Sequence, residues 1–126
     1  MHNKIVINSV GIIGAGQMGT GIAEVLGASD YKVYVNDIDK TKLITLHDKI
    51  KIGMNKQILK GKLTTEKCEL TLENIHCVDD LSAIGACDLV IEAVTEDETI
   101  KIAIFKKLEP YLKRETILTS NTSSIS

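Results

Sequence analysis

The strongest indication of the fold of this 126-residue chain is the run Val10-Gly11-Ile12-Ile13-Gly14-Ala15-Gly16-Gln17-Met18-Gly19. The first four residues of this run are apolar or glycine, which predicts a short buried strand. Apolar residues at helical spacing begin at Met18 and predict a helix directly after the glycines. A glycine-rich turn in this context can hold an anionic group, because free N–H groups and the helix dipole meet there. The alternative is a plain glycine-rich turn.

Each glycine of the G-x-G-x-x-G pattern has its own expected task. Gly14 makes the tight turn, Gly16 lets a pyrophosphate approach the backbone, and Gly19 lets the helix pack close to the strand. The pattern therefore predicts a dinucleotide site.

An acidic residue, Asp37, follows the next predicted strand, 32–36, and lies 18 residues after Gly19. A carboxylate there can accept hydrogen bonds from ribose hydroxyls and would repel a 2′-phosphate, which favours NAD over NADP. Arg114 is the only arginine of the chain, so no arginine follows Asp37 to bind that phosphate. The alternative is a helix cap, a role that Asp39 can share.

Strands and helices are predicted to alternate along the whole chain. Expected strands cover 10–13, 32–36, 75–78, 88–94 and 116–119, with helices from 18, over 43–60, 64–72, 80–84 and 97–109. This order predicts an α/β fold of the doubly wound Rossmann type, with a mainly parallel sheet and helices on both faces. We expect one domain, 1–126, because no linker interrupts it.

Composition narrows the function classes further. Hydrophobic residues make up 44%, charged residues 25%, and the net charge is −2, which is ordinary for a globular domain and argues against nucleic-acid binding. There is no apolar run of about 20 residues and no signal-peptide pattern, so we expect a cytoplasmic protein without a membrane partner. Cys68, Cys77 and Cys87 form no C-x-x-C pair, which predicts free thiols and no metal site.

A lysine-rich stretch, 49–62, contains five lysines and no acidic residue. At helical spacing Lys49, Lys56 and Lys60 form one stripe, which could bind a phosphorylated ligand. On the residues alone, a solvated helix face is the favoured interpretation.

Polar residues also follow the last two predicted strands, at the same sheet edge as the glycines. They are Glu92, Glu96, Lys101 and the run 121–124. Hydrogen bonds to ribose, nicotinamide or substrate and ordinary turn chemistry explain them equally well. The three histidines, His2, His47 and His76, are all predicted to lie away from this edge.

Five blocks together resemble the N-terminal domain of 3-hydroxyacyl-CoA dehydrogenases, most of all the bacterial 3-hydroxybutyryl-CoA type. The blocks are Gly11 to Ala23, Asp37, Lys60 to Thr64, Asp88 to Val94, and Ser120 to Ser124. The resemblance covers essentially the whole chain. It implies NAD-dependent hydride transfer at C3 of an L-3-hydroxyacyl-CoA, in fatty-acid or butanoate metabolism.

The resemblance also implies a role for individual residues. Lys56 and Lys60 would meet the CoA phosphates of the acyl-CoA substrate, and Ser123 would be the catalytic residue that hydrogen-bonds the 3-oxygen. The cofactor-binding set would be Gly14, Gly16, Gln17, Met18 and Gly19 at the pyrophosphate, Asp37 at the adenosine ribose, and Glu96, Lys101 and Asn121 towards the nicotinamide.

The family's catalytic histidine, its glutamate partner and a C-terminal helical domain would all lie beyond Ser126. We therefore expect a truncated chain that binds NAD without turnover. The parent would be a homo-oligomer, and this chain a monomer or a dimer paired at its open sheet edge. Two alternatives stay open: a nucleotide-binding module without catalysis, and a 3-hydroxyisobutyrate-type dehydrogenase, which has no use for a CoA-binding stripe.

Overall fold

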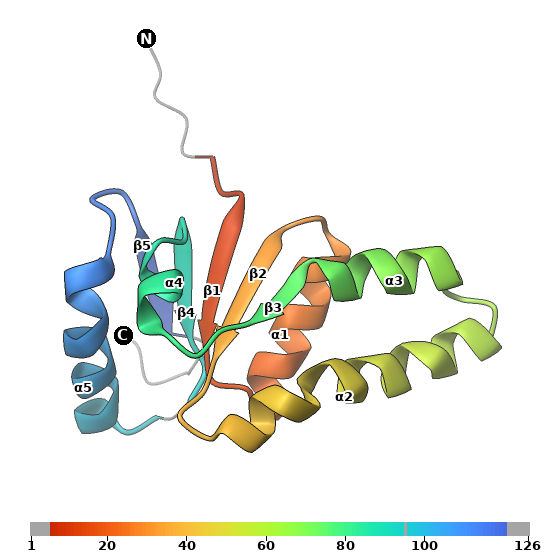
Figure 1. The fold of residues 1–126 in the computed structure, drawn as a ribbon, viewed down its shortest axis with the longest axis horizontal. Coiled ribbons are helices and arrows are strands. Elements are labelled where there is room, and N and C mark those ends of the chain that lie inside the picture. Colours follow the sequence, from red (N-terminus) through yellow and green to blue (C-terminus); the bar gives the residue numbers. More distant parts are fainter. Residues whose placement is uncertain (1–5, 95, 121–126) are drawn as a thin grey trace, which may run out of the picture.

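The computed structural model describes residues 6–94 and 96–120 of the chain (Figure 1). Strands and helices alternate along it, as the sequence predicts. In chain order the elements are β1 (Ser9–Ile13), α1 (Gln17–Ala28), β2 (Lys32–Asn36), α2 (Lys40–Leu59), α3 (Thr65–Glu73), β3 (Ile75–Cys77), α4 (Leu81–Gly85), β4 (Leu89–Glu92), α5 (Glu98–Leu108), the 3-10 turn η1 (Glu109–Tyr111) and β5 (Ile117–Ser120).

The five strands form one parallel sheet in the order β3-β2-β1-β4-β5. Helices α1, α2 and α3 cover one face, while α4 and α5 cover the other (Figure 1). The chain first runs from β1 outward to β3 and then returns to β4, so the strand order reverses between β1 and β4. The predicted doubly wound fold is confirmed, and in such sheets ligands bind at the carboxyl ends of the strands where the order reverses.

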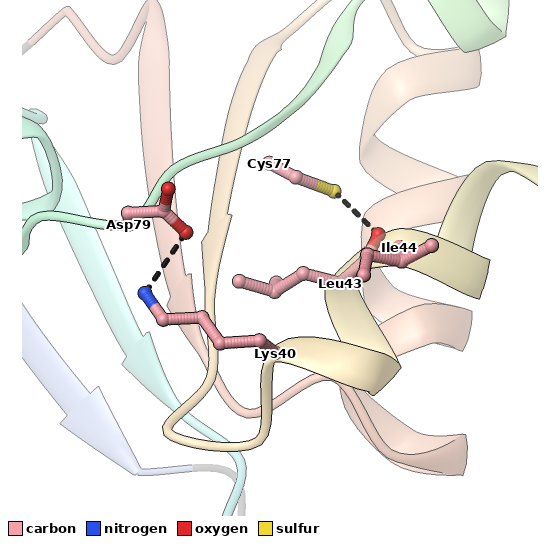
Figure 2. Close-up of a pocket in the computed structure, with 5 residues that line it drawn as sticks. All are labelled: Lys40, Leu43, Ile44, Cys77 and Asp79. Atoms are coloured by element: carbon pink, nitrogen blue, oxygen red, sulfur yellow. Dashed lines mark hydrogen bonds and ion pairs between the residues drawn. The ribbon is translucent and has the colours of Figure 1, made fainter.

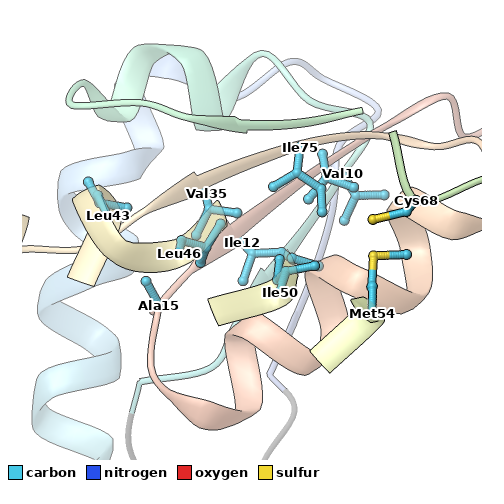
Figure 3. Close-up of a cluster of buried hydrophobic side chains, with 12 residues drawn as sticks. Val10, Ile12, Ala15, Val35, Leu43, Leu46, Ile50, Met54, Cys68 and Ile75 are labelled. Atoms are coloured by element: carbon cyan, nitrogen blue, oxygen red, sulfur yellow. The ribbon is translucent and has the colours of Figure 1, made fainter. Parts of the chain in front are cut away.

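Two aliphatic cores lie on the two faces of the sheet, because successive strand residues point in opposite directions. The larger core packs α1, α2 and α3 on the sheet (Figure 3), and its buried members are Val10, Ile12, Ala15, Ala23, Val33, Val35, Leu43, Leu46, Ile50, Met54, Cys68 and Ile75. The smaller core contains Ile13, Ile84, Cys87, Val90 and Leu108. Helix α2 buries one residue every three or four positions, whereas Ile44, Ile52 and Leu59 are exposed, so it is loosely amphipathic as predicted.

Side chains cap the starts of α2, α3, α4 and α5. Asp39 accepts a hydrogen bond from the Thr41 amide at 3.0 Å, and Asp97 accepts one from the Thr99 amide at 2.8 Å. Thr64 and Asp80 do the same for α3 and α4. Such caps satisfy N–H groups that a helix leaves without internal partners. Helix α1 has no such side-chain cap.

Strand β4 is shorter than predicted, ending at Glu92 instead of residue 94. The backbone turns there because the Val94 amide donates to the Glu92 carboxylate instead of joining the ladder. Strand β3 ends one residue early, and β5 is shifted by one residue, to Ile117–Ser120. Pro110 ends α5 as expected, since the backbone tightens into the 3-10 turn around it.

An acidic residue, Asp88, ties the amino-terminal edge of the sheet together just before β4. Its Oδ2 accepts from the amides of Asn8 and Ser9 at 2.9 and 3.1 Å, and its Oδ1 accepts from Lys113 Nζ at 2.6 Å. The Lys113 ammonium and the two amides hold the pKa of the Asp88 carboxyl well below its ordinary value. This carboxylate therefore joins segments that lie about 80 residues apart.

Replacing Asp88 with asparagine should lower the free energy of unfolding by about 1–2 kcal/mol at pH 7, because the negative charge is lost and one acceptor oxygen cannot replace the two that serve Lys113 and the amides. The folded-state pKa is depressed, so this stabilisation is fully present above the ordinary value of 3.8 and is lost as the pH falls below it. Denaturant titrations between pH 7 and pH 3 should show the gap to wild type narrowing below about pH 4.

The matched control is Asp79→Asn, which removes an ion pair to Lys40 between two well-exposed side chains. Exposed pairs contribute little, so its unfolding curve should overlay that of wild type. A gap for Asp88→Asn that stayed constant with pH would contradict this account.

Candidate dinucleotide site

The glycine loop between β1 and α1 has a geometry that only glycine permits at two positions. Gly14 has a φ of +117°, and a Cβ there would lie 2.9 Å from the backbone of Ala93. A Cβ on Gly19 would lie 1.7 Å from the Gly14 carbonyl oxygen. Gly16 differs, because apart from its two chain neighbours no described atom lies within 4 Å of its hypothetical Cβ. The loop is thus closely packed behind Gly14 and Gly19 and open at Gly16.

The start of α1 lies directly at this open position. Gly16 is the N-cap residue, and no described side chain accepts a hydrogen bond from the first turn of the helix. That turn also carries no acidic residue. Its N–H groups are available to an anion, and the helix dipole favours negative charge there. Gln17 and Met18 are exposed on the same turn.

Asp37 is buried immediately after β2. Its Oδ2 accepts from the Ala15 amide at 2.7 Å, and its Oδ1 accepts from the Asp39 amide at 2.8 Å. The Gly14 amide also donates to the carbonyl of Asn36 at 2.8 Å. Asp37 therefore anchors the glycine loop to the end of β2. It does not cap α2, since that bond is made by Asp39.

The predicted residues beyond β4 occupy different environments. Glu92 is fully buried, and its carboxylate accepts from the Val94 amide and the Ser120 hydroxyl. Lys101 lies on the first turn of α5 with a buried side chain, and its Nζ is 3.9 Å from Glu98 Oε1. Glu96 is exposed before α5. Asn121 and Ser123 lie outside the described residues, so their roles stay predictions.

The predicted lysine stripe lies on the outer surface of α2, away from the sheet. Lys56 is exposed in the last turn of the helix, and Lys60 is exposed at its C-cap. The two lysines therefore lie at the end of α2 that leads into α3, the helix pair that projects from the sheet in Figure 1. Contact with a phosphorylated ligand and a solvated helix face are both compatible with this placement.

The described histidines make contacts within the fold, and the cysteines are not paired. His47 Nε2 is 2.6 Å from the Ile75 carbonyl oxygen, and His76 stacks on Tyr34 at the β3 edge of the sheet. All three cysteines are free thiols, as predicted. Among residues 6–94 and 96–120, no cluster of three potential metal ligands occurs, and no helix there is long and apolar enough to cross a bilayer.

A separate open pocket of about 380 Å³ lies beside β3 (Figure 2), lined by Lys40, Leu43, Ile44, Cys77 and Asp79. Lys40 and Asp79 pair across it at 2.9 Å, and the Cys77 thiol donates to the Leu43 carbonyl at 3.4 Å. Burial, with the nearby Asp79 charge, raises the pKa of this thiol. The thiol therefore stays protonated at neutral pH, and the pocket includes no residue of the glycine loop.

Sequence reasoning missed the side-chain link made by Asn36 and left the role of Glu92 undecided. The Asn36 amide donates to the Val78 carbonyl at 2.8 Å and so fixes the loop after β3. Each is a polar residue that ends an otherwise apolar strand, and that position was the available signal. The Asn36 and Glu92 side chains thus connect neighbouring segments at the carboxyl edge of the sheet.

Comparison with known proteins identifies relatives over nearly the whole chain. The 3-hydroxyacyl-CoA dehydrogenase, NAD binding domain family model matches residues 9–126. The chain is 43% identical over 120 residues to the 3-hydroxyadipyl-CoA dehydrogenase of Escherichia coli, covering 95% of this chain and 25% of the relative. It is 45% identical over 115 residues to a probable 3-hydroxybutyryl-CoA dehydrogenase of Deinococcus radiodurans, covering 91% and 41%.

Solved structures agree with the sequence relatives. A 3-hydroxybutyryl-CoA dehydrogenase from Escherichia coli superposes with a TM-score of 0.91 and 42% identity, over 96% of this chain and 26% of that one. The (S)-3-hydroxybutyryl-CoA dehydrogenase of Ralstonia eutropha gives 0.90 and 34%, over 96% and 43%. This chain thus spans less than half the length of these relatives. With the family model and the glycine-loop geometry, these matches show that the chain belongs to the 3-hydroxyacyl-CoA dehydrogenase NAD-binding domain family, whose cofactor is NAD.

Proposed function

We propose that this domain holds the NAD of an L-3-hydroxyacyl-CoA dehydrogenase. The observation that carries the proposal is the open N–H turn at Gly16, which a Cβ would fill and which no described side chain caps. When bound, NAD accepts a hydride from C3 of the substrate, or NADH returns it. The chain's own residues bind and orient the cofactor for that step.

Different residues at and beside the glycine loop would bind different parts of the dinucleotide. Gly16, with the amides of Gln17, Met18 and Gly19, would face the pyrophosphate, while Gly14 sets the turn. Asp37 would accept hydrogen bonds from the adenosine ribose at the end of β2. Because its buried carboxylate would repel a 2′-phosphate, we infer a preference for NAD over NADP.

The remaining roles are proposals that rest on the resemblance and on each residue's place in the chain. Glu96, Lys101 and Asn121 would contact the nicotinamide end, and Ser123 would hydrogen-bond the 3-oxygen of the substrate. Lys56 and Lys60 would meet the CoA phosphates, which fits their exposure on α2. A free hydroxyacid would leave those lysines without a phosphate partner.

The substrate we propose is a short-chain acyl-CoA such as 3-hydroxybutyryl-CoA, in fatty-acid or butanoate metabolism. Two relatives of nearly equal identity are named for different substrates, 3-hydroxybutyryl-CoA and 3-hydroxyadipyl-CoA. Of the proposed substrate, the acyl group therefore has the weakest support. We also propose that this domain binds NAD without turnover by itself, since the relatives are more than twice as long. A cytoplasmic location fits the three free thiols.

Calorimetric titration with NADH, then with acetoacetyl-CoA, tests the proposal. Wild type should bind NADH, and Asp37→Ala should weaken that binding by roughly 100-fold, because a charged acceptor for ribose and for the Ala15 amide is lost. Asp37→Asn, which keeps an acceptor for Ala15, should retain more affinity. Absence of NADH binding in a folded sample would refute the proposal. Full turnover by this chain would refute only the proposal that the domain is inactive by itself.

A further inference from the structure

A fully buried carboxylate, that of Glu92, lies at the carboxyl end of β4 beside the dinucleotide site. Its Oε2 accepts from the Val94 amide, and its Oε1 accepts from the Ser120 hydroxyl at 2.8 Å. Burying a carboxylate costs several kcal/mol unless hydrogen bonds satisfy it. These bonds join the loop after β4 to the end of β5, two segments 28 residues apart.

The loop after β4 also lies directly against the glycine loop. The Ala93 amide donates to the Ile13 carbonyl at 2.8 Å, and a Cβ on Gly14 would lie 2.9 Å from the Ala93 oxygen and 3.1 Å from a Val94 methyl. Val94 is therefore held from two sides, by the packed glycine loop and by the Glu92 carboxylate. The ends of β1, β4 and β5 form one connected unit.

The β4 and β5 ends of this unit lie on the side of the strand reversal opposite to Asp37. A dinucleotide binds across the reversal, so the adenosine half belongs with Asp37 at β2 and the nicotinamide half belongs with the ends of β4 and β5. Glu92 has no exposed surface and can act only through its partners. We propose that Glu92 is a positioning residue that shapes the nicotinamide half of the site, an inference that rests on the proposed function.

Two ligands separate a positioning role from a general structural one. NADH occupies both halves of the site, whereas ADP offers only the adenosine and the pyrophosphate. Ser120→Ala removes one partner of Glu92 from a half-buried position, and Glu92→Ala removes the bonds to Val94 and to Ser120 together. Glu92→Gln is the rescue variant, because its amide can accept from Val94 and donate to Ser120. Asp88→Asn, at the other end of β4, is the matched control.

In calorimetric titrations Ser120→Ala should raise the Kd for NADH about 5- to 10-fold, while the Kd for ADP stays within about twofold. Glu92→Ala should widen this difference, and Glu92→Gln should restore NADH binding to within about threefold of wild type. Asp88→Asn should lower stability without changing the ratio of the two Kd values.

Equal weakening of NADH and ADP in Ser120→Ala and Glu92→Ala would overturn the inference, because the effect would then be general. Unchanged NADH binding in both variants would overturn it as well. In either case wild type still binds NADH, so the proposed function survives. If folded wild type bound neither ligand, the proposed function would fail and the inference with it.

Discussion

Replacing Gly19 with alanine should lower the free energy of unfolding by about 3 kcal/mol and abolish NADH binding. An added Cβ would lie 1.7 Å from the Gly14 carbonyl oxygen and 2.8 Å from its carbon. Both are backbone atoms, so no side chain can rotate away, and α1 must move off the glycine loop. The N–H groups of its first turn would move with it, which removes the anion site. Denaturant unfolding and NADH calorimetry measure the two effects.

Gly21→Ala is the control for this substitution, because it adds the same methyl group two residues later in the same helix. Apart from the helix's own backbone, no atom lies within 4 Å of its Cβ. Alanine is the better helix former, so the variant should be as stable as wild type or more stable by up to about 1 kcal/mol. A Gly19→Ala variant that unfolded like Gly21→Ala would refute the close-packing account.

Gly16→Ala should weaken NADH binding strongly while leaving the protein folded. Gly16 has a φ of −76°, which alanine adopts readily, and beyond its two chain neighbours its Cβ would meet no described atom within 4 Å. Because alanine is a poorer N-cap than glycine, the free energy of unfolding should fall, but by no more than about 1 kcal/mol. The methyl group would nevertheless occupy the space in which a pyrophosphate must approach the backbone. We expect NADH to bind at least about 100-fold more weakly.

Local sequence patterns predicted the sheet edge and the glycine loop because their information is contiguous. The strand before Gly14, the helix after Gly16 and the spacing to Asp37 are all readable along the chain. The pattern could not show that Asp37 also accepts from the Ala15 amide, because that contact joins residues 22 positions apart. The carboxylate that we propose as the ribose acceptor is therefore also an anchor of the glycine loop.

The hydrogen bonds of the buried Glu92 and the partly buried Asp88 could not be predicted from the sequence, for the same physical reason. Asp88 directly precedes β4 and Glu92 is its last residue, but their partners come from β5, from the chain before β1 and from Lys113. Only the folded sheet brings these segments together. The alternation of strands and helices fixes which edge each acid occupies, whereas its hydrogen bonds depend on the register of neighbouring strands.

Calorimetric titration of NADH into Gly16→Ala and wild type, with thermal unfolding of both, shows whether the dinucleotide lies against the glycine loop. We expect both proteins to be folded, with the variant unfolding at a slightly lower temperature, and a loss of NADH affinity of at least about 100-fold in the variant. Equal NADH affinity in the two folded proteins would contradict this expectation, because the pyrophosphate could not then lie against the open backbone at Gly16.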